Sequence, residues 1–174
     1  MLHLVTHHYG SPRGTLLLAA VDDRLCLCDW TTASHHHRLL ARLLHHCQAV
    51  EHEGLSPIIE QATAWLDEYF SGHGPSWRLP LNPSGTPFQR SVWAGLLDIP
   101  YGCTLSYGAL ARSLGMPRAV RAVAGAVGAN PLSLFVPCHR ITGSHGALGG
   151  YAGGEAAKRW LLDHEHAALT SAAP

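Results

Sequence analysis

A segment rich in proline and glycine divides this chain of 174 residues into two halves of similar length. It covers residues 72–85 and carries three prolines, whose rings fix φ and remove backbone hydrogen-bond donors. Such a composition interrupts helices and central strands and is typical of a linker. We therefore expect an N-terminal domain with its linker over residues 1–85 and a second domain over residues 86–174.

The composition indicates a compact protein. Apolar residues make up 47% of the sequence and charged residues 14%, which disordered polyelectrolytes do not show. The longest apolar run, over residues 15–21, is far shorter than the ~20 residues of a membrane span. Residues 1–10 lack the basic start and apolar core of a secretion signal. We expect a cytoplasmic protein with no membrane partner, whose five cysteines are free thiols.

Strand and helix signals alternate along the first half. Apolar runs bounded by turn residues predict strands over residues 2–9, 14–21 and 25–30. Two helices are expected to follow. One covers about residues 34–47, and the other has Ser56 as N-cap, Pro57 at its first position and Gly72 as its stop. This order of elements indicates an α/β domain.

The second half begins with a helix-capping signal and continues with a helix-turn-helix pattern. Thr86 and Gln89 form a capping box, and Pro87 suits the first helical position. Further along, helices are expected over residues 106–114 and 117–127. The turn between them is short and contains glycine, as in DNA-binding helix-turn-helix units.

The second helix of this unit has two unlike faces. The side expected to face inward consists of Ala119, Val120, Val123 and Val127. The opposite side carries Arg118, Arg121, Ala122, Gly125 and Ala129, most of which are small. Small side chains around an arginine let a helix approach a DNA groove closely. The same spacing also fits an ordinary alanine-rich helix in a core, and the spacing alone does not separate the two.

Charge is unevenly distributed although the formal net charge is zero. Residues 1–85 hold five Arg against eight Asp and Glu, whereas residues 86–174 hold seven Arg and Lys against four acidic residues. No carboxylate occurs over residues 99–154, which contain Arg112, Arg118, Arg121 and Arg140. A stretch without acids suits a polyanionic partner such as nucleic acid.

The candidate nucleophile is Cys138, in the run Pro137-Cys138-His139-Arg140-Ile141 that follows a strand-like apolar segment over residues 132–136. A thiol becomes a good nucleophile when a neighbouring group such as imidazole favours its ionised form. Neighbours on an extended segment point to opposite faces, so we expect His139 to act on Cys138 through a water. Glu165 is a candidate to orient the imidazole. An isolated Cys-His pair is also compatible with a cysteine that only packs in the core.

Six glycines lie within residues 143–154, together with Tyr151. This segment lacks the Gly-Lys-Ser/Thr ending of a phosphate-binding loop. It is compatible with a wall where backbone approaches a ligand closely and Tyr151 provides an aromatic platform. A flexible surface loop is the alternative.

Taken in order, these motifs resemble the 6-O-alkylguanine-DNA alkyltransferases (methylated-DNA–protein-cysteine methyltransferases). The matching residues are Thr86-Pro87-Phe88-Gln89, Ser106-Tyr107, Pro137-Cys138-His139-Arg140-Ile141, Gly149-Gly150-Tyr151-Ala152-Gly153-Gly154, and Lys158 to Glu165 with Trp160-Leu161-Leu162 between them. The similarity is close over residues 86–168 and loose before them. It implies an α+β protein, with an N-terminal α/β domain of ribonuclease H-like topology. The C-terminal domain is helical and carries the helix-turn-helix and the active-site cysteine.

The resemblance also implies roles for individual residues. Catalytic roles fall on Cys138, His139, Glu165, Tyr107 and Asn130; DNA contacts on Arg121, Ala119, Ala122 and Gly125; and the base pocket on Ile141, Tyr151, Ala152 and Gly153. In this family Cys138 takes the alkyl group irreversibly from a flipped-out guanine, with Arg121 filling the gap in the stack and Tyr107 protonating the base. The expected partner is double-stranded DNA carrying alkylated guanine. The chain is expected to act as a monomer without a cofactor.

Some members of this family hold a structural zinc in the N-terminal half. Here Cys26 and Cys28 are expected on one strand face, with histidines from His35 onward, but four ligands do not match that pattern. We therefore predict no metal site and interpret these cysteines as structural thiols.

Three other functions compete with alkyl transfer. A module that flips alkylated guanine without reacting is disfavoured by Cys138, since such relatives carry Trp at that position. A helix-turn-helix regulator with an oxidant-sensing thiol has no need of Tyr107 or the glycine-rich wall. Cysteine-dependent hydrolysis is the weakest alternative, because nothing in the sequence indicates an acyl substrate.

Overall fold

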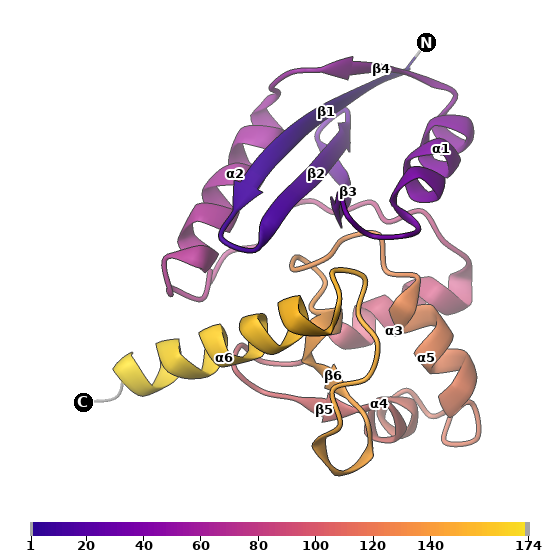
Figure 1. Cartoon of the computed structure of the whole chain (residues 1–174). Coiled ribbons are helices and arrows are strands. Elements are labelled where there is room, and N and C mark those ends of the chain that lie inside the picture. The colour runs from indigo at the N-terminus through magenta and orange to yellow at the C-terminus, as the bar shows by residue number, and fades with distance from the viewer. Residues whose placement is uncertain (1, 173–174) are drawn as a thin grey trace. The chain divides into compact units, whose positions relative to one another are not determined.

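The computed structural model describes residues 2–172, which belong to two compact units (Figure 1). The N-terminal unit is Met1–Ser84 and the C-terminal unit is Gly85–Pro174. Each unit contains its own secondary structure and its own set of buried apolar side chains. No helix within residues 2–172 is long and apolar enough to cross a membrane.

A four-stranded sheet forms the centre of the N-terminal unit. Its strands are β1 (Leu2–Ser11), β2 (Gly14–Val21), β3 (Arg24–Trp30) and β4 (Ala49–Glu53). Their order is β3-β2-β1-β4, and all neighbours are antiparallel except β1 and β4, which are parallel. The first three strands confirm the sequence prediction. The sequence does not predict β4, because four of its five side chains are exposed and it has no apolar pattern.

Two helices, α1 (His36–Cys47) and α2 (Pro57–Phe70), cover opposite faces of this sheet (Figure 1). Leu17 and Ala19 of β2 share a buried cluster with Leu43 of α1, and no residue of α2 belongs to that cluster. Alternate side chains of a strand point to opposite faces, so α2, which contacts β1, β2 and β3, covers the other one. The start of α2 confirms the sequence prediction, since the Ser56 side chain accepts a hydrogen bond from Ile59 N.

A bulge in β3 places two cysteines on opposite faces of the sheet. Ala19 pairs with Leu27 and Ala20 pairs with Leu25, so Cys26 is the extra residue. Cys26 lies in the α1-side cluster, whereas Cys28 pairs with Leu18 of β2, which faces the other side. The expectation that Cys26 and Cys28 share a face is therefore wrong, because the bulge breaks the two-residue alternation.

Part of the proline-rich segment is attached to the sheet. Leu25 N donates to Pro80 O at 2.9 Å, and Asn82 N donates to Leu25 O at 2.8 Å. These two bonds form a parallel bridge between Leu25 and Leu81. A segment expected to be only a linker thus continues the hydrogen bonding of β3 at the edge of the sheet.

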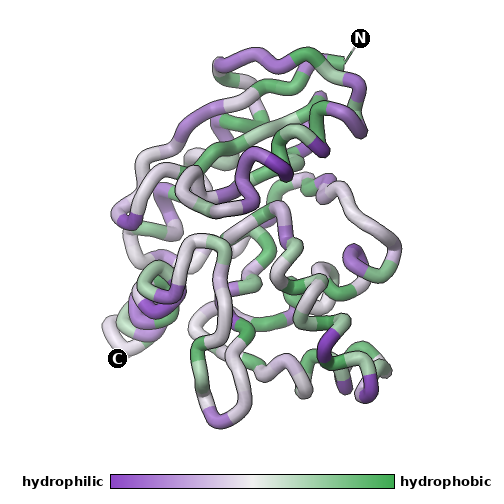
Figure 2. Tube along the Cα trace, turned by 45° about the vertical axis from the view of Figure 1, so that its right-hand side comes forward, coloured by the Kyte–Doolittle hydropathy of each residue, from purple (hydrophilic) through white to green (hydrophobic). Residues whose placement is uncertain are grey.

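The C-terminal unit is mainly helical. It contains α3 (Pro87–Leu96), α4 (Tyr107–Ser113), α5 (Val120–Gly128) and α6 (Glu155–Ala172), the short strands β5 (Leu105–Ser106) and β6 (Ile141–Thr142), and two 3₁₀ turns, Cys138–Arg140 and Ser144–Gly146. The capping box of Thr86 and Gln89 is confirmed. Trp93 Nε1 donates to Ala126 O at 2.8 Å and so joins α3 to α5. Figure 2 shows hydrophilic and hydrophobic positions alternating around α6, which ends at the C label.

Three predicted elements differ in the structure. Helix α5 begins at Val120, not at 117, and Val120 is 36% exposed, not inward-facing. A turn precedes α5, in which Ala119 N donates a hydrogen bond to Met116 O. No side chain caps the N-terminus of α5. Helix α6 extends beyond Glu165 to Ala172 because no breaker follows Glu165. The strand-like run over residues 132–136 is a buried loop.

The N-terminal unit buries one carboxylate beside two histidines. Asp29 is fully buried, and its Oδ2 lies 3.7 Å from both His35 Nε2 and His36 Nδ1. Those distances are too long for hydrogen bonds. Burial raises the pKa of Asp29 to about 7, although a hydrogen bond from the Trp30 backbone acts in the opposite direction. Burial also lowers the pKa of His35 and of His36.

We expect Asp29→Asn to raise the melting temperature at pH 8, and to raise it less as the pH falls toward 4. Between the unfolded pKa of roughly 3.9 and the folded pKa of about 7, the folded wild-type protein binds more protons than the unfolded chain. The stability of the wild-type protein therefore falls as pH rises through this window, because the buried carboxyl group must ionise. The amide of the Asp29→Asn variant does not ionise and has no such cost. Thermal melts across this range measure the difference. Asp23→Asn, at an exposed turn position, is the control, and a pH-independent effect at Asp29 contradicts the prediction.

Candidate active site

Asn130 holds the loop that leads to Cys138. Its side chain is 2% exposed, and both ends of the amide are used. Nδ2 donates to Val136 O at 2.9 Å, and Oδ1 accepts from Leu132 N at 3.0 Å. These bonds replace the sheet partners that a strand here would need, which explains why the apolar run over residues 132–136 forms a loop.

Tight turns then present the cysteine. Phe135 N bonds to Ser133 O at 3.0 Å around Leu134, whose φ of 73° lies in the region that favours glycine. Cys138 N bonds to Val136 O at 2.8 Å around Pro137, at φ −81° and ψ 63°, which is an inverse γ-turn. Cys138 itself begins a 3₁₀ turn that extends to Arg140. The expected extended segment at Cys138 and His139 is therefore wrong.

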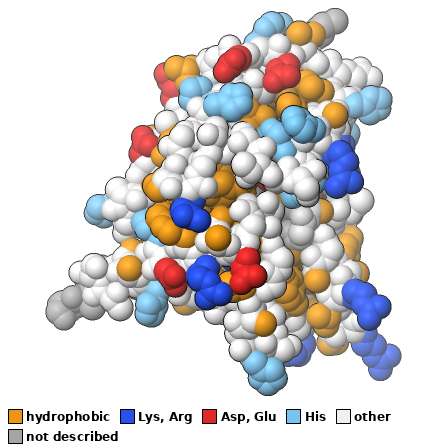
Figure 3. All heavy atoms as spheres, in the orientation of Figure 1, with side chains coloured by type: hydrophobic (Ala, Val, Ile, Leu, Met, Phe, Trp, Pro, Cys, Tyr) orange, Lys and Arg blue, Asp and Glu red, His pale blue; other side chains and the backbone are white. Residues whose placement is uncertain are grey.

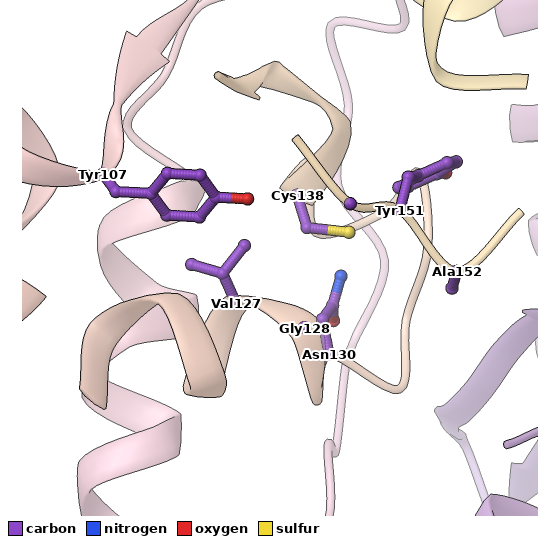
Figure 4. A pocket seen from close by; sticks show the side chains of 8 residues that line it. Tyr107, Val127, Gly128, Asn130, Cys138, Tyr151 and Ala152 are labelled. Carbon is purple, nitrogen blue, oxygen red and sulfur yellow. The ribbon is translucent and has the colours of Figure 1, made fainter. Parts of the chain in front are cut away.

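Cys138 lines a small cavity within the C-terminal unit (Figure 4). The lining residues are Tyr107, Val127, Gly128, Asn130, Cys138, Gly150, Tyr151 and Ala152. In Figure 4 the Tyr107 hydroxyl and the Cys138 sulfur both point into this space. Cys138 is 8% exposed, and the cavity has a volume of about 30 Å³, which is enough to hold a water molecule.

A two-residue pairing brings Tyr107 to Cys138. Strand β5 runs parallel to β6, with Leu105 opposite Ile141 and Ser106 opposite Thr142. The Ser106 side chain caps α4 by accepting a hydrogen bond from Ala109 N, so Tyr107 starts that helix at the cavity. Burial raises the pKa of Tyr107, and the neighbouring Cys138 charge raises it further. The phenol therefore keeps its proton at neutral pH.

The glycine-rich segment forms the facing wall. Gly149 has a φ of +71°, and a side chain there would place its Cβ 3.3 Å from the Tyr107 hydroxyl. Glycine is needed at this position for both reasons. Tyr151 and Ala152 follow along the same wall and line the cavity.

Glu165 of α6 is the centre of a buried network behind the cavity. Its Oε1 lies 2.6 Å from His139 Nε2 and 3.0 Å from Arg140 Nη2. Its Oε2 accepts from Arg140 Nε and from Gly102 N, both at 2.9 Å. Arg140 Nη1 also donates to Ile99 O at 2.8 Å. The carboxylate thus joins the 3₁₀ turn of the cysteine to α6 and to the loop before β5.

The electrostatics of this network keep the imidazole neutral. Burial alone raises the pKa of Glu165, but the hydrogen bonds from His139 and Arg140 and the charge of Arg140 outweigh it and hold that pKa well below its usual range. Burial lowers the pKa of His139, opposed by Glu165 and assisted by the charges of Arg140 and Lys158. The site therefore combines an ionised carboxylate with a neutral imidazole whose Nε2–H faces it.

The arginines of the acid-free stretch do not all lie on the surface. Arg112, Arg118 and Arg121 are exposed, whereas Arg140 is 9% exposed and is paired with Glu165. Of the four arginines expected to suit a polyanionic partner, Arg140 is therefore wrong, because its charge is buried against Glu165. In Figure 3, Lys and Arg side chains without acidic neighbours lie at the edge of the C-terminal unit that α4 and α5 occupy in Figure 1.

The helix-turn-helix presents most of its expected outer face to solvent. Arg121, Ala122 and Gly125 of α5 are exposed, and no atom lies within 4 Å of a Cβ built at Gly125. Ala119 is the N-cap of α5 and is partly buried. The inner face contains Val123, which is fully buried.

Two residues expected in the base pocket do not line this cavity. Ile141 is fully buried in β6, and Gly153 lies one residue beyond the lining segment. Sequence reasoning in turn missed Val127 and Gly128 as lining residues, and it assigned no role to Lys158. Helical spacing was the available signal for Lys158, since it recurs with Leu161 and Glu165 on the inward face of α6, where all three are fully buried.

A metal site is not formed by the residues that the structure describes. Over residues 2–172, no group of three or more His, Cys, Asp and Glu side chains is arranged to bind a metal ion.

Both halves of the chain match models of one protein family. The family model "6-O-methylguanine DNA methyltransferase, DNA binding domain" matches residues 87–167, and the model of the same family's ribonuclease-like domain matches residues 4–83. The chain belongs to the 6-O-methylguanine DNA methyltransferase family. This confirms the resemblance seen in the sequence motifs.

Individual members of the 6-O-methylguanine DNA methyltransferase family agree. The methylated-DNA–protein-cysteine methyltransferase of Shigella flexneri is 40% identical over 168 residues, covering 95% of this chain and 97% of that protein. The constitutive enzyme of Bacillus subtilis is 39% identical, covering 89% and 91%. The O6-methylguanine methyltransferase structure from Mycobacterium tuberculosis has a TM-score of 0.80 at 36% identity, covering 100% and 96%. The expected α+β fold is confirmed.

We expect Arg140→Met to lower the free energy of unfolding by about 3–5 kcal/mol, because it leaves the buried Glu165 charge without its main partner. Urea denaturation followed by tryptophan fluorescence measures this loss. Arg159→Met is the matched control, since Arg159 pairs with Glu155 at 3.4 Å on the exposed side of α6. Such a surface pair contributes about 0.5 kcal/mol. Equal losses in the two variants contradict the structural role of the network.

Proposed function

We propose that this methyltransferase repairs double-stranded DNA by moving the alkyl group of 6-O-alkylguanine onto the sulfur of Cys138. The observation that carries the proposal is that Cys138 and Tyr107 line one cavity, while His139, the residue after Cys138, is bonded to the buried Glu165. The relatives named above are methylated-DNA–protein-cysteine methyltransferases, and a Mycobacterium tuberculosis neighbour at TM-score 0.81 is in complex with DNA.

The proton of the Cys138 thiol passes to His139. Glu165 accepts a hydrogen bond from the Nε2–H of the imidazole. The other ring nitrogen, Nδ1, therefore carries the lone pair that accepts a proton. One water molecule relays that proton from the sulfur, as the cavity has room for one. The ionised Glu165 then stabilises the imidazolium that forms.

The thiolate attacks the alkyl carbon in line with the bond to the guanine oxygen. A carbon–sulfur bond forms, the carbon–oxygen bond breaks, and the electron pair stays on the purine. Tyr107 donates its proton to the base, so the guanine leaves without a full negative charge. The raised pKa of Tyr107, caused by burial and by Cys138, keeps that proton available until the transfer.

The alkylated base must leave the helix to be repaired. Inside the stack its alkyl group is out of line with any protein nucleophile, so the nucleotide rotates out of the duplex. The cavity that Cys138 lines is the space that the base enters, and Gly150, Tyr151 and Ala152 form one wall of it. Arg121 projects from a face of small residues and fills the space that the base leaves. Ala119, Ala122 and Gly125 let α5 approach the groove.

The reaction ends after one transfer. The product at Cys138 is a thioether, which has no ionisable leaving group and no resolving thiol to release it. The protein is therefore consumed stoichiometrically. It acts as a monomer on DNA and needs no cofactor, because substrate and acceptor supply every atom of the reaction.

Incubation with duplex DNA carrying 6-O-methylguanine is expected to transfer one methyl group per protein molecule and then stop. Intact-protein mass measures the stoichiometry, and peptide mapping locates the methyl group on Cys138. Cys138→Ser is expected to bind the lesion without transfer, whereas Cys103→Ala, which removes an exposed thiol, retains full transfer. A methyl group at another residue, or repeated turnover, overturns the proposal.

Arg121→Ala is expected to slow transfer from duplex DNA at saturating concentration by at least about tenfold, with little change for free 6-O-methylguanine. Only the duplex requires the base to be flipped, at a cost of a few kcal/mol. Single-turnover rates on the two substrates measure the difference. Arg118→Ala removes the same charge from a neighbouring exposed position and serves as the control. Equal losses on both substrates exclude a flipping role.

A further inference from the structure

A lysine lies fully buried in the first turns of α6. The side chain of Lys158 is 0% exposed, although lysine is almost never completely buried without a partner. Its Nζ has one hydrogen bond, to Gly150 O at 3.5 Å, which is at the upper limit of length. Taking an ammonium group out of water at this position is costly, so it needs compensation from another group.

None of the described carboxylates provides that compensation. Glu165 is the only carboxylate among the buried residues described in the C-terminal unit, and its two oxygens are occupied by His139, Arg140 and Gly102. The ion pairs found within residues 2–172 do not include Lys158. The buried side chains described in the C-terminal unit thus include two cationic groups, Arg140 and Lys158, and one carboxylate.

The Lys158 ammonium lies next to the wall of the cavity. A Cβ built at Gly149 lies 3.9 Å from Lys158 Nζ and 3.3 Å from the Tyr107 hydroxyl, so both groups meet the same residue of the wall. Gly150, whose carbonyl Lys158 contacts, lines the cavity together with Cys138. Burial lowers the pKa of Lys158, while a negative charge on Cys138 raises it.

We propose that Lys158 is the electrostatic partner of the Cys138 thiolate and supplies the positive charge that the buried site otherwise leaves unbalanced. The inference rests on the proposed function of Cys138 as alkyl acceptor. Lys158 keeps its proton throughout. The thiol proton goes to His139, the sulfur gains the alkyl carbon, and the purine takes the electron pair and the Tyr107 proton. A nearby opposite charge favours the ionised form of the thiol and so increases the fraction that reacts.

The test compares Lys158→Met with Arg159→Met. Both remove one positive charge from α6, but Arg159 is exposed and pairs only with Glu155 among the described carboxylates. Iodoacetamide labelling of Cys138, resolved by peptide mass, is measured against pH. Single-turnover methyl transfer from duplex DNA is measured over the same range.

Lys158→Met is expected to move the midpoint of Cys138 labelling up by about one pH unit, which is a typical effect of one close charge. Methyl transfer at pH 7 falls by about tenfold and recovers at pH 9, where bulk hydroxide ionises the thiol. Binding of lesion-bearing DNA is unchanged. Arg159→Met shows the wild-type profile. Methionine matches the apolar volume of the lysine stem, so the melting temperature does not fall, and Lys158→Gln provides a second neutral variant.

Two results overturn this inference. If the pH midpoint of Cys138 labelling is unchanged in both Lys158→Met and Lys158→Gln, Lys158 has no electrostatic role. If the methyl group is still found on Cys138 in that case, the proposed function stands. A loss of transfer that does not recover at high pH shows that Lys158 acts through folding or packing. The proposed function fails separately, if wild-type protein carries the methyl group on another residue.

Discussion

The catalytic half of this protein depends on one buried carboxylate. Glu165 accepts hydrogen bonds from His139, Arg140 and Gly102 N, and so ties α6, the 3₁₀ turn of the cysteine and the loop before β5 to one point. A carboxylate removed from water is tolerated only when its lone pairs are satisfied and its charge is balanced. Arg140 provides that balance, which leaves the imidazole neutral and able to accept a proton.

The cysteine itself is positioned by backbone geometry. Asn130 and the turn at Pro137 both use Val136 O as an acceptor, so the approach to Cys138 has little freedom. The opposite wall is built differently, from glycines around Gly149 that leave the backbone close to Tyr107. A cysteine fixed by backbone turns thus lies opposite a wall with few side chains.

Local signals account for what the sequence predicted well. The capping box at Thr86, the N-cap at Ser56 and the alternating runs of β1 to β3 depend on neighbouring residues, and the structure reproduces them. The order of motifs around Cys138 indicated the family. Strand β4, the bulge at Cys26 and the loop over residues 132–136 were missed or wrong, because each depends on hydrogen bonds to residues distant in the sequence or to a side-chain amide.

The sequence alone determined that the chain carries a Pro-Cys-His-Arg motif after a helix-turn-helix pattern, since residue type and spacing are enough to define both patterns. Only the tertiary structure decided which charges are buried. Arg140 looks like a surface cation and Lys158 like an ordinary helix residue, yet both are buried, and Arg140 pairs with Glu165. Burial is a property of packing between distant segments, and it is burial that turns an exposed charge of little consequence into one that controls the chemistry of its neighbours.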